Sequence, residues 1–501
     1  MPKSLTIHPT EVRRSGQIEF QPIPVNQYCR TLTDELDRFA REDLVRIYRD
    51  MAIIRAFETM LQEVKTKTVY QGIEYNHRGP AHLSIGQEAS AVGQAFLLGV
   101  DDHIFGSHRS HGEILAKGLS AIEKLDDSAL LDIMRRYMDG AILKVVEQPL
   151  PQSSILSPPS STVKDLAIDF LLYGALAEIF GREAGFNRGM GGSMHAFFTP
   201  FGIYPNNAIV GGSADIAVGA ALFKKVLHER GIVIANIGDA AATCGPTWEA
   251  LCFATMDQFK TLWDEAHRGG LPLIVNFVNN FYGMGGQPVG ETGGFGILAR
   301  MGAGLTPEQA HAERVDGYNP LAVIDAIARK KEVIERGDGP VLLDTVTYRY
   351  SGHSPSDASS YRVKEEIEEW QRVDSIVTYR EDLEKAGLLT EADVERIGAE
   401  IDARILRAYK KAIDLDLSPR ADLYSVGSLL DRTMFSNGRV ESPHIARPSE
   451  ALAPREENPR VKQLAGRSRS GLGPNGEALP KGRCIAVRDA LFEAILDRFY
   501  A

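Results

Sequence analysis

Apolar residues repeat at helical spacing in some stretches of the chain and form short continuous runs in others. Residues 41–64 carry apolar side chains three and four positions apart, which predicts a helix with one apolar face. Further along, short apolar runs alternate with helical patterns, as is typical of a parallel sheet with right-handed crossovers. The predicted elements are strands at 103–108, 231–239, 271–280 and 340–350, and helices at 214–230, 246–270 and 320–339.

The segments outside this α/β pattern differ in composition. Residues 363–412 are heavily charged and helix-rich, whereas 147–163 is rich in Pro and Ser and is interpreted as a surface insertion. A long stretch near the C-terminus is rich in Pro, Gly, Ser and charge, which predicts a flexible linker. The predicted organisation is an N-terminal arm at 1–44, an α/β domain at 45–425, a disordered linker at 426–484 and an amphipathic helix at 485–501.

Composition and charge exclude several classes of function. The 501 residues are 44% hydrophobic and 25% charged, enough for a large core. The net charge is −11 and basic residues are scattered, so we expect no nucleic-acid partner. No apolar run reaches the roughly 18 residues of a membrane span, and the first residues lack the apolar region of a secretory signal. The four cysteines form no CxxC pair, which favours a reduced compartment, and we expect a cytoplasmic location.

Polar residues stand at the ends of two predicted strands that are one helix apart. Asp239 closes 231–239 in "GDAAATCGPTWEALC", and Asn280 closes 271–280 in "VNNFYGMGG". Ligands bind outside the carboxyl ends of parallel strands, so neighbouring strands would bring both side chains into one crevice. Carboxylate and amide oxygens suit Mg²⁺, and the small residues after Asp239 would admit a diphosphate near a helix N-terminus. The alternative is that Asp239 caps a helix and Asn280 forms a turn.

Several blocks, in a fixed order, carry a resemblance to a known family. Gly-Asp, a helix, an apolar strand and Asn-Asn resemble the thiamine diphosphate motif. The chain is similar to the α subunit of the decarboxylating component of 2-oxo acid dehydrogenase complexes. The resemblance implies a thiamine diphosphate-binding fold, a doubly wound parallel sheet with helices on both faces. The supporting blocks are "HLSIGQEASAVG" (82–93), "SHRSHG" (107–112), "GMGGSMHAF" (189–197), "IVGGSADIAVGAAL" (209–222), "VNNFYGMG" (278–285), "RVDGYNP" (314–320) and "TYRYSGHSPSDASSYR" (347–362).

The resemblance also implies roles for individual residues. Asp239, Asn280 and the backbone carbonyl of Tyr282 would bind Mg²⁺. His82 would face the substrate, and His353 would lie beside both the diphosphate and the substrate entrance. The residues implied to contact the cofactor are His108, Arg109, Ala208, Val210, Gly238, Ala240, Ala241 and His353. If the resemblance is set aside, the simpler interpretation is that Arg109 is a surface charge and that these histidines have structural roles.

The chain departs from the family pattern at four places. Ala240 stands where the motif has a second Gly, and His108 stands where the family has the Tyr of a Tyr-Arg pair. The predicted helix before the Asn-Asn strand is lengthened by residues 258–270, and the insertion at 147–163 is also unusual.

The resemblance further implies a partner chain. In this family the glutamate that hydrogen-bonds the cofactor's aminopyrimidine lies on a β subunit, and we find no second α/β domain here that could supply it. We therefore expect a β subunit in an α₂β₂ assembly, and a lipoyl-bearing acyltransferase as the acceptor. "AVRDALFEAILDRFY" (486–500) resembles the opening helix of that β subunit. It is a remnant of an α–β fusion or an ordinary amphipathic helix.

The function implied is thiamine diphosphate- and Mg²⁺-dependent oxidative decarboxylation of a 2-oxo acid, with acyl transfer to a lipoyl domain. Pyruvate-like substrates are favoured over branched-chain ones. An acetoin-cleaving dehydrogenase subunit and a degenerate, non-catalytic cofactor-binding subunit are the alternatives. A nicotinamide dehydrogenase is disfavoured because "GMGGSM" does not fit the dinucleotide fingerprint after a strand.

Overall fold

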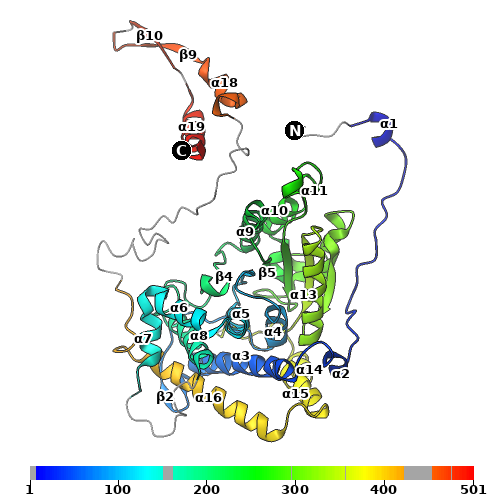
Figure 1. Cartoon of the computed structure of the whole chain (residues 1–501), viewed down its shortest axis with the longest axis vertical. Helices are drawn as coiled ribbons and strands as arrows, with labels where there is room; N and C mark the ends of the chain where they lie inside the picture. The colour runs from blue at the N-terminus through cyan, green and yellow to red at the C-terminus, as the bar shows by residue number, and fades with distance from the viewer. Residues whose placement is uncertain are drawn as a thin grey trace. The chain divides into compact units, whose positions relative to one another are not determined.

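The computed structural model describes residues 7–150, 162–294, 296–355, 357–422, 454–475, 477–483 and 485–500. The chain divides into two compact units, residues 1–435 and residues 436–501, and each is described by itself. In the first unit the long apolar helix predicted at 41–64 is α3, which runs from Arg41 to Lys67 (Figure 1).

A six-stranded sheet forms the centre of the first unit. All five neighbouring strand pairs are parallel, as the alternation of strands and helices predicts. The two central strands, β5 and β6, are buried along nearly their whole length, because helices cover both faces of the sheet. The strand order is β4 (Ile203–Tyr204), β3 (His103–Phe105), β5 (Val233–Gly238), β6 (Leu273–Asn279), β8 (Val341–Val346) and β7 (Glu313–Asp316). The edge strands β4 and β7 were not predicted, because β4 has only two residues and β7, with the sequence ERVD, has only one apolar side chain.

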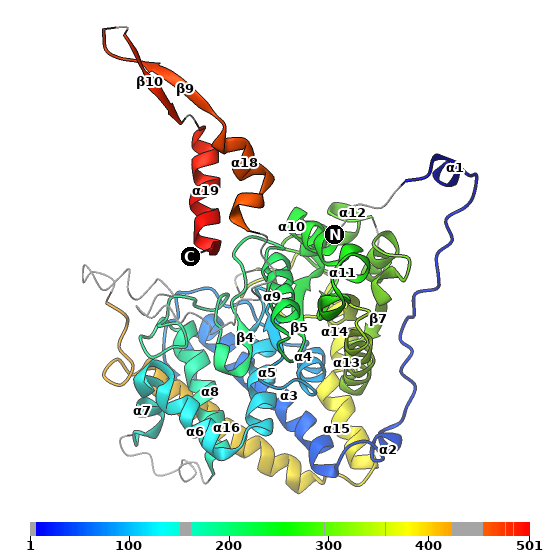
Figure 2. The same cartoon turned by 45° about the horizontal axis from the view of Figure 1, so that its top comes forward.

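Helices pack on both faces of the sheet, which confirms the doubly wound architecture. Successive residues of β5 alternate between two apolar clusters, with Ile234 in one and Val233 and Ala235 in the other. Figures 1 and 2 show α9 and α10 on one side of β5, and α4 and α5 on the other. These helices are α4 (Glu88–Ala95), α5 (His111–Lys124), α9 (Ser213–Leu227), α10 (Gly245–Ala254) and α13 (Pro320–Glu335).

The prediction of one helix over 246–270 is wrong. α10 ends at Ala254, and a separate short helix, α11, covers Gln258–Thr261. The chain turns between them, and Phe259 becomes 2% exposed with its ring 5.8 Å from that of Phe253. Burial of this aromatic side chain outweighs the helical preference of the segment.

The N-terminal arm runs along the edge of the sheet. The Asn26 amide donates to the Arg314 carbonyl at 2.9 Å, and the Arg314 amide donates to Pro24 at 2.9 Å. These bonds cover part of the open edge of β7, whose backbone groups would otherwise be exposed. Two short helices interrupt the arm: α1 (Pro9–Val12) and α2 (Leu32–Glu35).

Helices dominate the remainder of the first unit. The charged stretch at 363–412 forms three helices, as predicted, and Arg404 joins the last of them to α8 through Asp165 and Asp169. These helices are α14 (Lys364–Arg372), α15 (Ser375–Lys385) and α16 (Glu391–Ile413). The others are α6 (Asp127–Arg136), α7 (Ala141–Glu147), α8 (Val163–Ile179) and α12 (Pro288–Glu291), with a small hairpin of β1 (Val69–Tyr70) and β2 (Ile73–Glu74).

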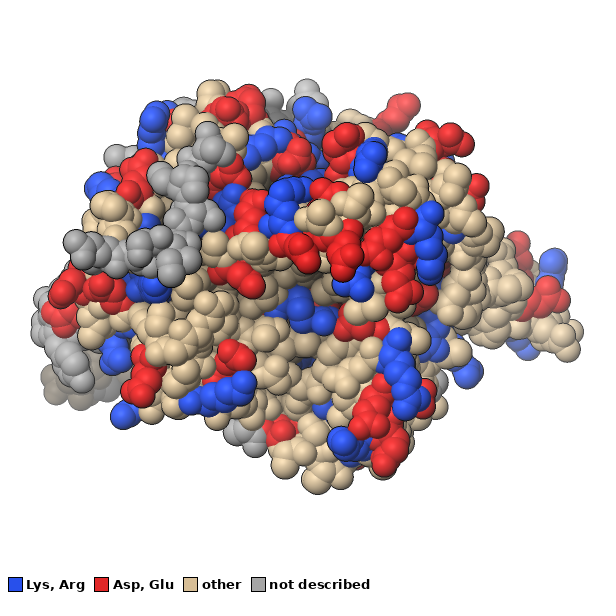
Figure 3. Space-filling model, turned by 90° about the horizontal axis from the view of Figure 1, so that it is seen from below, with Lys and Arg blue, Asp and Glu red and all other residues tan. Residues whose placement is uncertain are grey.

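The predicted insertion at 147–163 falls mostly on residues 151–161, which lie outside the described residues. In the part of the chain that the structure describes, no helix has the length and apolar character needed to cross a bilayer. Figure 3 shows acidic and basic side chains interspersed over one face of the described residues. Cys29, Cys244 and Cys252 are free thiols.

The second unit contains regular structure where the sequence predicts only a linker. A Pro after an Asn cap starts α18 (Pro459–Ala465), and a hairpin of β9 (Ser468–Leu472) and β10 (Ala478–Arg483) follows. Residues 426–453 of that predicted linker lie outside the described residues. The amphipathic pattern at the C-terminus forms α19 (Val487–Tyr500).

Candidate functional site

The two strand ends singled out in the sequence are neighbours. β5 pairs with β6 in parallel, with Gly238 opposite Val278, so Asp239 and Asn280 follow adjacent strands at the same sheet edge. Asp239 is 4% exposed. Its Oδ1 accepts the Ala240 amide at 2.8 Å, while its buried Oδ2 has no hydrogen-bond partner among the described residues. An unpartnered buried carboxylate oxygen suits a cation ligand, and burial raises the pKa of Asp239 to about 6.

Asn280 is held in one orientation by its own side-chain bonds. Its Nδ2 donates to Gln87 Oε1 at 3.1 Å, and its Oδ1 accepts the Tyr282 amide at 3.2 Å. The amide oxygen therefore faces the turn that also carries the Tyr282 carbonyl. Gln87 was not predicted as a site residue, although it lies in the block "HLSIGQEASAVG", because only its position in space reveals the contact.

The structure accommodates Ala240 in place of the usual glycine. A side chain at Gly283 would come within 3.2 Å of the Ala240 Cβ, so the absence of one at 283 makes room for the methyl group. Gly238, Ala240 and Ala241 are all half-buried at this edge. The residues present therefore fit a divalent ion with a phosphate group beside it.

Arg109 is buried and joins three segments of chain. It is 3% exposed, and its Nη1 and Nη2 donate to the Leu83 carbonyl at 2.7 Å and the His353 carbonyl at 2.9 Å. Burial, with the nearby Arg349, lowers its pKa to about 9, so it stays cationic at neutral pH. Arg109 is therefore not a surface charge.

Arg349 is a second buried arginine at this edge, which the sequence analysis did not select. Its Nη2 donates to the Gly283 carbonyl at 3.1 Å and its Nη1 to Ser351 at 2.8 Å, while its Nε has no partner among the described residues. Its charge, like that of Arg109, favours the ionised form of Asp239. The residue lies in "TYRYSGHSPSDASSYR", but nothing in the pattern distinguishes it from other arginines.

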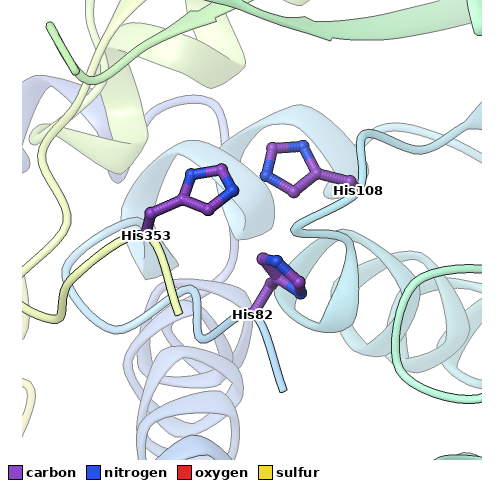
Figure 4. A group of neighbouring side chains, drawn as sticks. All are labelled: His82, His108 and His353. Carbon is purple, nitrogen blue, oxygen red and sulfur yellow. The ribbon is translucent and has the colours of Figure 1, made fainter. Parts of the chain in front are cut away.

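Three histidines from three loops meet beside these arginines, and we call them the histidine cluster: His82, His108 and His353. Each pair of ring centroids is 5.2 Å apart, and Figure 4 shows the three rings facing one another. His82 is buried, His353 half-buried and His108 exposed. Burial and the Arg109 charge lower the pKa of His82 to about 3 and that of His353 to about 4, so these two imidazoles are neutral at neutral pH.

A buried chain of polar contacts lies behind His82. Its amide donates to Ser193 Oγ at 3.3 Å, and the same hydroxyl is 2.9 Å from His111 Nε2. His111 Nδ1 in turn contacts Glu58 Oε1 at 2.7 Å. Neither His111 nor Glu58 was selected from the sequence, because a buried His–Glu pair has no pattern of its own.

The loop at "GMGGSM" is organised by one carboxylate. Glu178 accepts four backbone amides, those of Asn187, Gly189, Gly191 and Gly192, at 2.6 to 3.1 Å. This loop carries Ser193, which contacts His82. One buried side chain thus holds the loop against the histidine cluster.

Ala208 and Val210 lie on an exposed loop before α9. Val210 is 63% exposed, and Ala208 is exposed as well. Just upstream, the Asn206 Nδ2 donates to the Ser107 carbonyl at 3.0 Å, next to His108. The loop is thereby joined to the end of β3, close to the histidine cluster.

This parallel sheet, with helices on both faces, is consistent with a thiamine diphosphate-binding fold, and the comparisons identify the family. A family model for the dehydrogenase E1 component matches residues 50–129 and 162–418, well over half of the chain. The chain belongs to the dehydrogenase E1 component family.

Similar proteins include E1 α subunits of pyruvate dehydrogenases. The probable mitochondrial pyruvate dehydrogenase E1 component subunit alpha of Caenorhabditis elegans is 29% identical over 393 residues, 77% of this chain and 78% of that protein. The pyruvate dehydrogenase E1 component subunit alpha of Zymomonas mobilis is 29% identical over 387 residues, 77% and 88% of the two chains. The type I mitochondrial subunit of Ascaris suum is 30% identical over 375 residues, 74% and 75% of the two chains.

Proposed function

We propose that the chain is the α subunit of a 2-oxo acid dehydrogenase that uses thiamine diphosphate and Mg²⁺ and transfers the acyl group to a lipoyl domain. The observation that carries this proposal is the unpartnered Oδ2 of Asp239, next to Asn280 on the adjacent strand end. The family and its pyruvate dehydrogenase relatives support the substrate class. Pyruvate-like acids are favoured.

Asp239, Asn280 and the carbonyl of Tyr282 would hold Mg²⁺. Diphosphate oxygens would complete the coordination sphere of the ion. Arg109 and Arg349 supply buried positive charge on the same side, which favours a bound diphosphate. Gly238, Ala240, Ala241, Ala208 and Val210 would contact the cofactor through backbone groups. When bound, the cofactor supplies the electron sink for decarboxylation.

The neutral imidazoles of His82 and His353 can each donate one N–H and accept one hydrogen bond. We assign them to the 2-oxo acid: His82 binds the substrate carboxylate and His353 holds or moves a proton at the entrance. His108, in place of tyrosine, can still donate a hydrogen bond to a phosphate oxygen.

The active site would be completed by a β subunit, since the family places the glutamate for the aminopyrimidine there. We infer an α₂β₂ assembly and a lipoyl-bearing acyltransferase as the acceptor. A cytoplasmic location stays a prediction.

Co-expression with candidate β chains, followed by a dye-coupled decarboxylation assay, tests the proposal. We expect turnover of pyruvate that requires both thiamine diphosphate and Mg²⁺. Turnover of acetoin or of branched 2-oxo acids instead would reassign the substrate. Failure to bind thiamine diphosphate with Mg²⁺ by calorimetry, with a β chain present, would point to a non-catalytic subunit and refute the proposal.

A further inference from the structure

We propose that Glu366 and Trp370 of α14, which we call the α14 clamp, are positioning residues for the metal site. They hold the turn at 280–282, which carries the Asn280 side chain and the Tyr282 carbonyl. The clamp acts through the side chains of this turn and supplies no ligand of its own. The inference rests on the proposed function, because it concerns the Mg²⁺ ligands assigned there.

The backbone of the turn is strained at its middle residue. Phe281 has a φ of 67°, in the left-handed region that residues other than glycine rarely adopt. Such a conformation persists only where the surrounding structure holds it. The ladder of the sheet reaches Asn279, whose carbonyl accepts the Thr347 amide at 2.8 Å. Residues 280–282 follow this last strand position, so side-chain contacts must hold them.

Glu366 holds the outer end of the Tyr282 side chain. The Tyr282 hydroxyl donates to the Glu366 carboxylate, at 2.9 Å from Oε1 and 2.8 Å from Oε2. The Tyr348 hydroxyl donates to Oε1 of the same group at 2.8 Å. Hydrogen bonds to a carboxylate are stronger than those between neutral groups. They fix the Tyr282 ring, and through it the direction in which the Tyr282 carbonyl points.

Trp370 holds the strained residue. It lies four positions after Glu366 in α14, so both side chains are on one face of the helix. Its ring stacks on that of Tyr348, with centroids 4.9 Å apart and an angle of 8° between the planes. Its centroid is also 6.3 Å from that of Phe281. One helix face thus contacts both residues that follow Asn280.

A buried arginine packs on the same aromatic rings. Arg362 is 8% exposed, and its guanidinium carbon lies 5.4 Å from the ring centroids of both Tyr282 and Tyr348. Its Nη1 donates to the Arg349 carbonyl at 2.6 Å, and Arg349 in turn donates to the Gly283 carbonyl. Tyr282 is therefore held by tertiary contacts and not by β6.

This arrangement makes the affinity for the ion depend on α14. Mg²⁺ requires near-ideal octahedral geometry, so a shift of the Tyr282 carbonyl would weaken binding even with Asp239 and Asn280 in place. Replacement of residues that orient metal ligands typically lowers metal affinity by about 10–100-fold. We expect a loss of this size when the α14 clamp is opened.

Hydrogen exchange of the full chain, without metal, cofactor or β chain, tests the clamp directly. The Tyr282 amide donates to Asn280 Oδ1 at 3.2 Å and the Gly283 amide to the Gly286 carbonyl at 2.8 Å, so both amides report on the turn. Glu366→Ala removes the acceptor of both tyrosine hydroxyls. We expect exchange at these two amides to become at least about 10-fold faster, with the amides of β6 unchanged.

Further variants separate the clamp from general destabilisation. Glu366→Gln keeps one acceptor oxygen and should give an intermediate effect, and Trp370→Leu should also speed exchange because it removes the aromatic stacking. Glu365→Ala is the matched control, one position earlier in α14 and exposed. Circular dichroism verifies that each variant folds.

Calorimetric titration of Mg²⁺ into the α–β complex, in the presence of thiamine diphosphate, measures the consequence for the site. The dissociation constant of Mg²⁺ should rise about 10–100-fold in Glu366→Ala and stay unchanged in Glu365→Ala. If Glu366 acts through Tyr282, the same substitution should cost much less when Tyr282→Phe, which lacks the hydroxyl, is already present.

The inference is overturned if exchange at Tyr282 and Gly283 is unaltered in Glu366→Ala, or if Glu365→Ala has an equal effect. Faster exchange with unchanged Mg²⁺ affinity also overturns it, because the clamp would then be purely structural while the proposed function stands. If the unmodified complex binds no Mg²⁺ with thiamine diphosphate, the proposed function fails and this inference fails with it.

Discussion

The strand ends at Asp239 and Asn280 and the histidine cluster lie at the same edge of the sheet but are positioned by different forces. Asp239 and Asn280 each follow a paired strand by one residue, so the hydrogen-bond ladder between β5 and β6 determines their positions. The cluster comes from loops, and His353 lies 244 residues from the Arg109 that holds it. The first arrangement depends on backbone hydrogen bonds, and the second on one buried side chain.

The two regions should therefore tolerate different kinds of substitution. A ladder of backbone hydrogen bonds survives most side-chain changes. The strand ends should therefore lose function only when Asp239 or Asn280 itself is replaced. Loops held by a buried guanidinium should lose their arrangement when that single group is removed.

Asp239→Ala should give the largest effect, and this effect should be confined to the site at the strand ends. Removing a proposed metal ligand should lower Mg²⁺-dependent activity by more than about 100-fold, since even supporting residues around a metal cost about 10–100-fold. Steady-state kinetics of the α–β complex would measure this loss. Asp316→Asn is the control, because Asp316 also ends a strand but its Oδ1 accepts the Tyr318 amide at 3.0 Å. Equal losses in the two variants would contradict the assignment.

Arg109→Met should break the loops and spare the ladder. The loss of two charged donors to the Leu83 and His353 carbonyls should cost about 2–4 kcal/mol of unfolding free energy, measured by urea denaturation. Hydrogen exchange should show lost protection around 82–84 and 353, with β5 and β6 unchanged. Arg136→Met, at a side chain that is 80% exposed, should leave stability unaltered. Loss of protection throughout the sheet would argue against two independent regions.

Glu178→Gln should loosen the loop that supports His82. An amide cannot accept at both ends, so two of the four backbone N–H groups lose their acceptor, at a cost of about 2–3 kcal/mol. The expected readout is faster amide exchange at 187–192. Glu395→Gln, at an exposed position, serves as the control. Unchanged exchange at these amides would show that the loop holds its shape without Glu178.

His77→Phe should give the smallest effect, and only in acid. His77 is 7% exposed and burial lowers its pKa to about 4. The unfolded chain therefore takes up a proton below about pH 6.5 that the folded chain does not, and stability falls as pH drops from 6.5 towards 4. Phenylalanine keeps the contact with Phe180, at 5.1 Å between centroids, and removes the titration. Near pH 4.5 the variant should recover about 2 kcal/mol relative to the unmodified chain, with no such gain at pH 8.

Equal pH profiles for both chains would assign the acid sensitivity elsewhere, for example to His82 or His353 in the histidine cluster. That outcome would assign the acid sensitivity to the site and not to the core.

The central strands and the strand-end pair could be predicted because their signals are local. The apolar runs at 231–239 and 271–280 match β5 and β6 within a few residues, and Asp239 and Asn280 follow them directly. The break between α10 and α11, within the single helix predicted at 246–270, could not be predicted, because burial of Phe259 against Phe253 overrides the local pattern. Gln87 and Arg349 were missed because a single Gln or Arg carries no periodicity.

The sequence by itself determined the doubly wound sheet, the family and the two strand ends, since continuous apolar runs and a residue directly after a strand have a meaning that is independent of the rest of the chain. Only the tertiary structure decided that Arg109 joins the segments of His82, His108 and His353, that Gly283 makes room for Ala240, and that Glu178 organises the glycine loop. These contacts join residues far apart in the chain, and their geometry follows from packing, which no local pattern encodes.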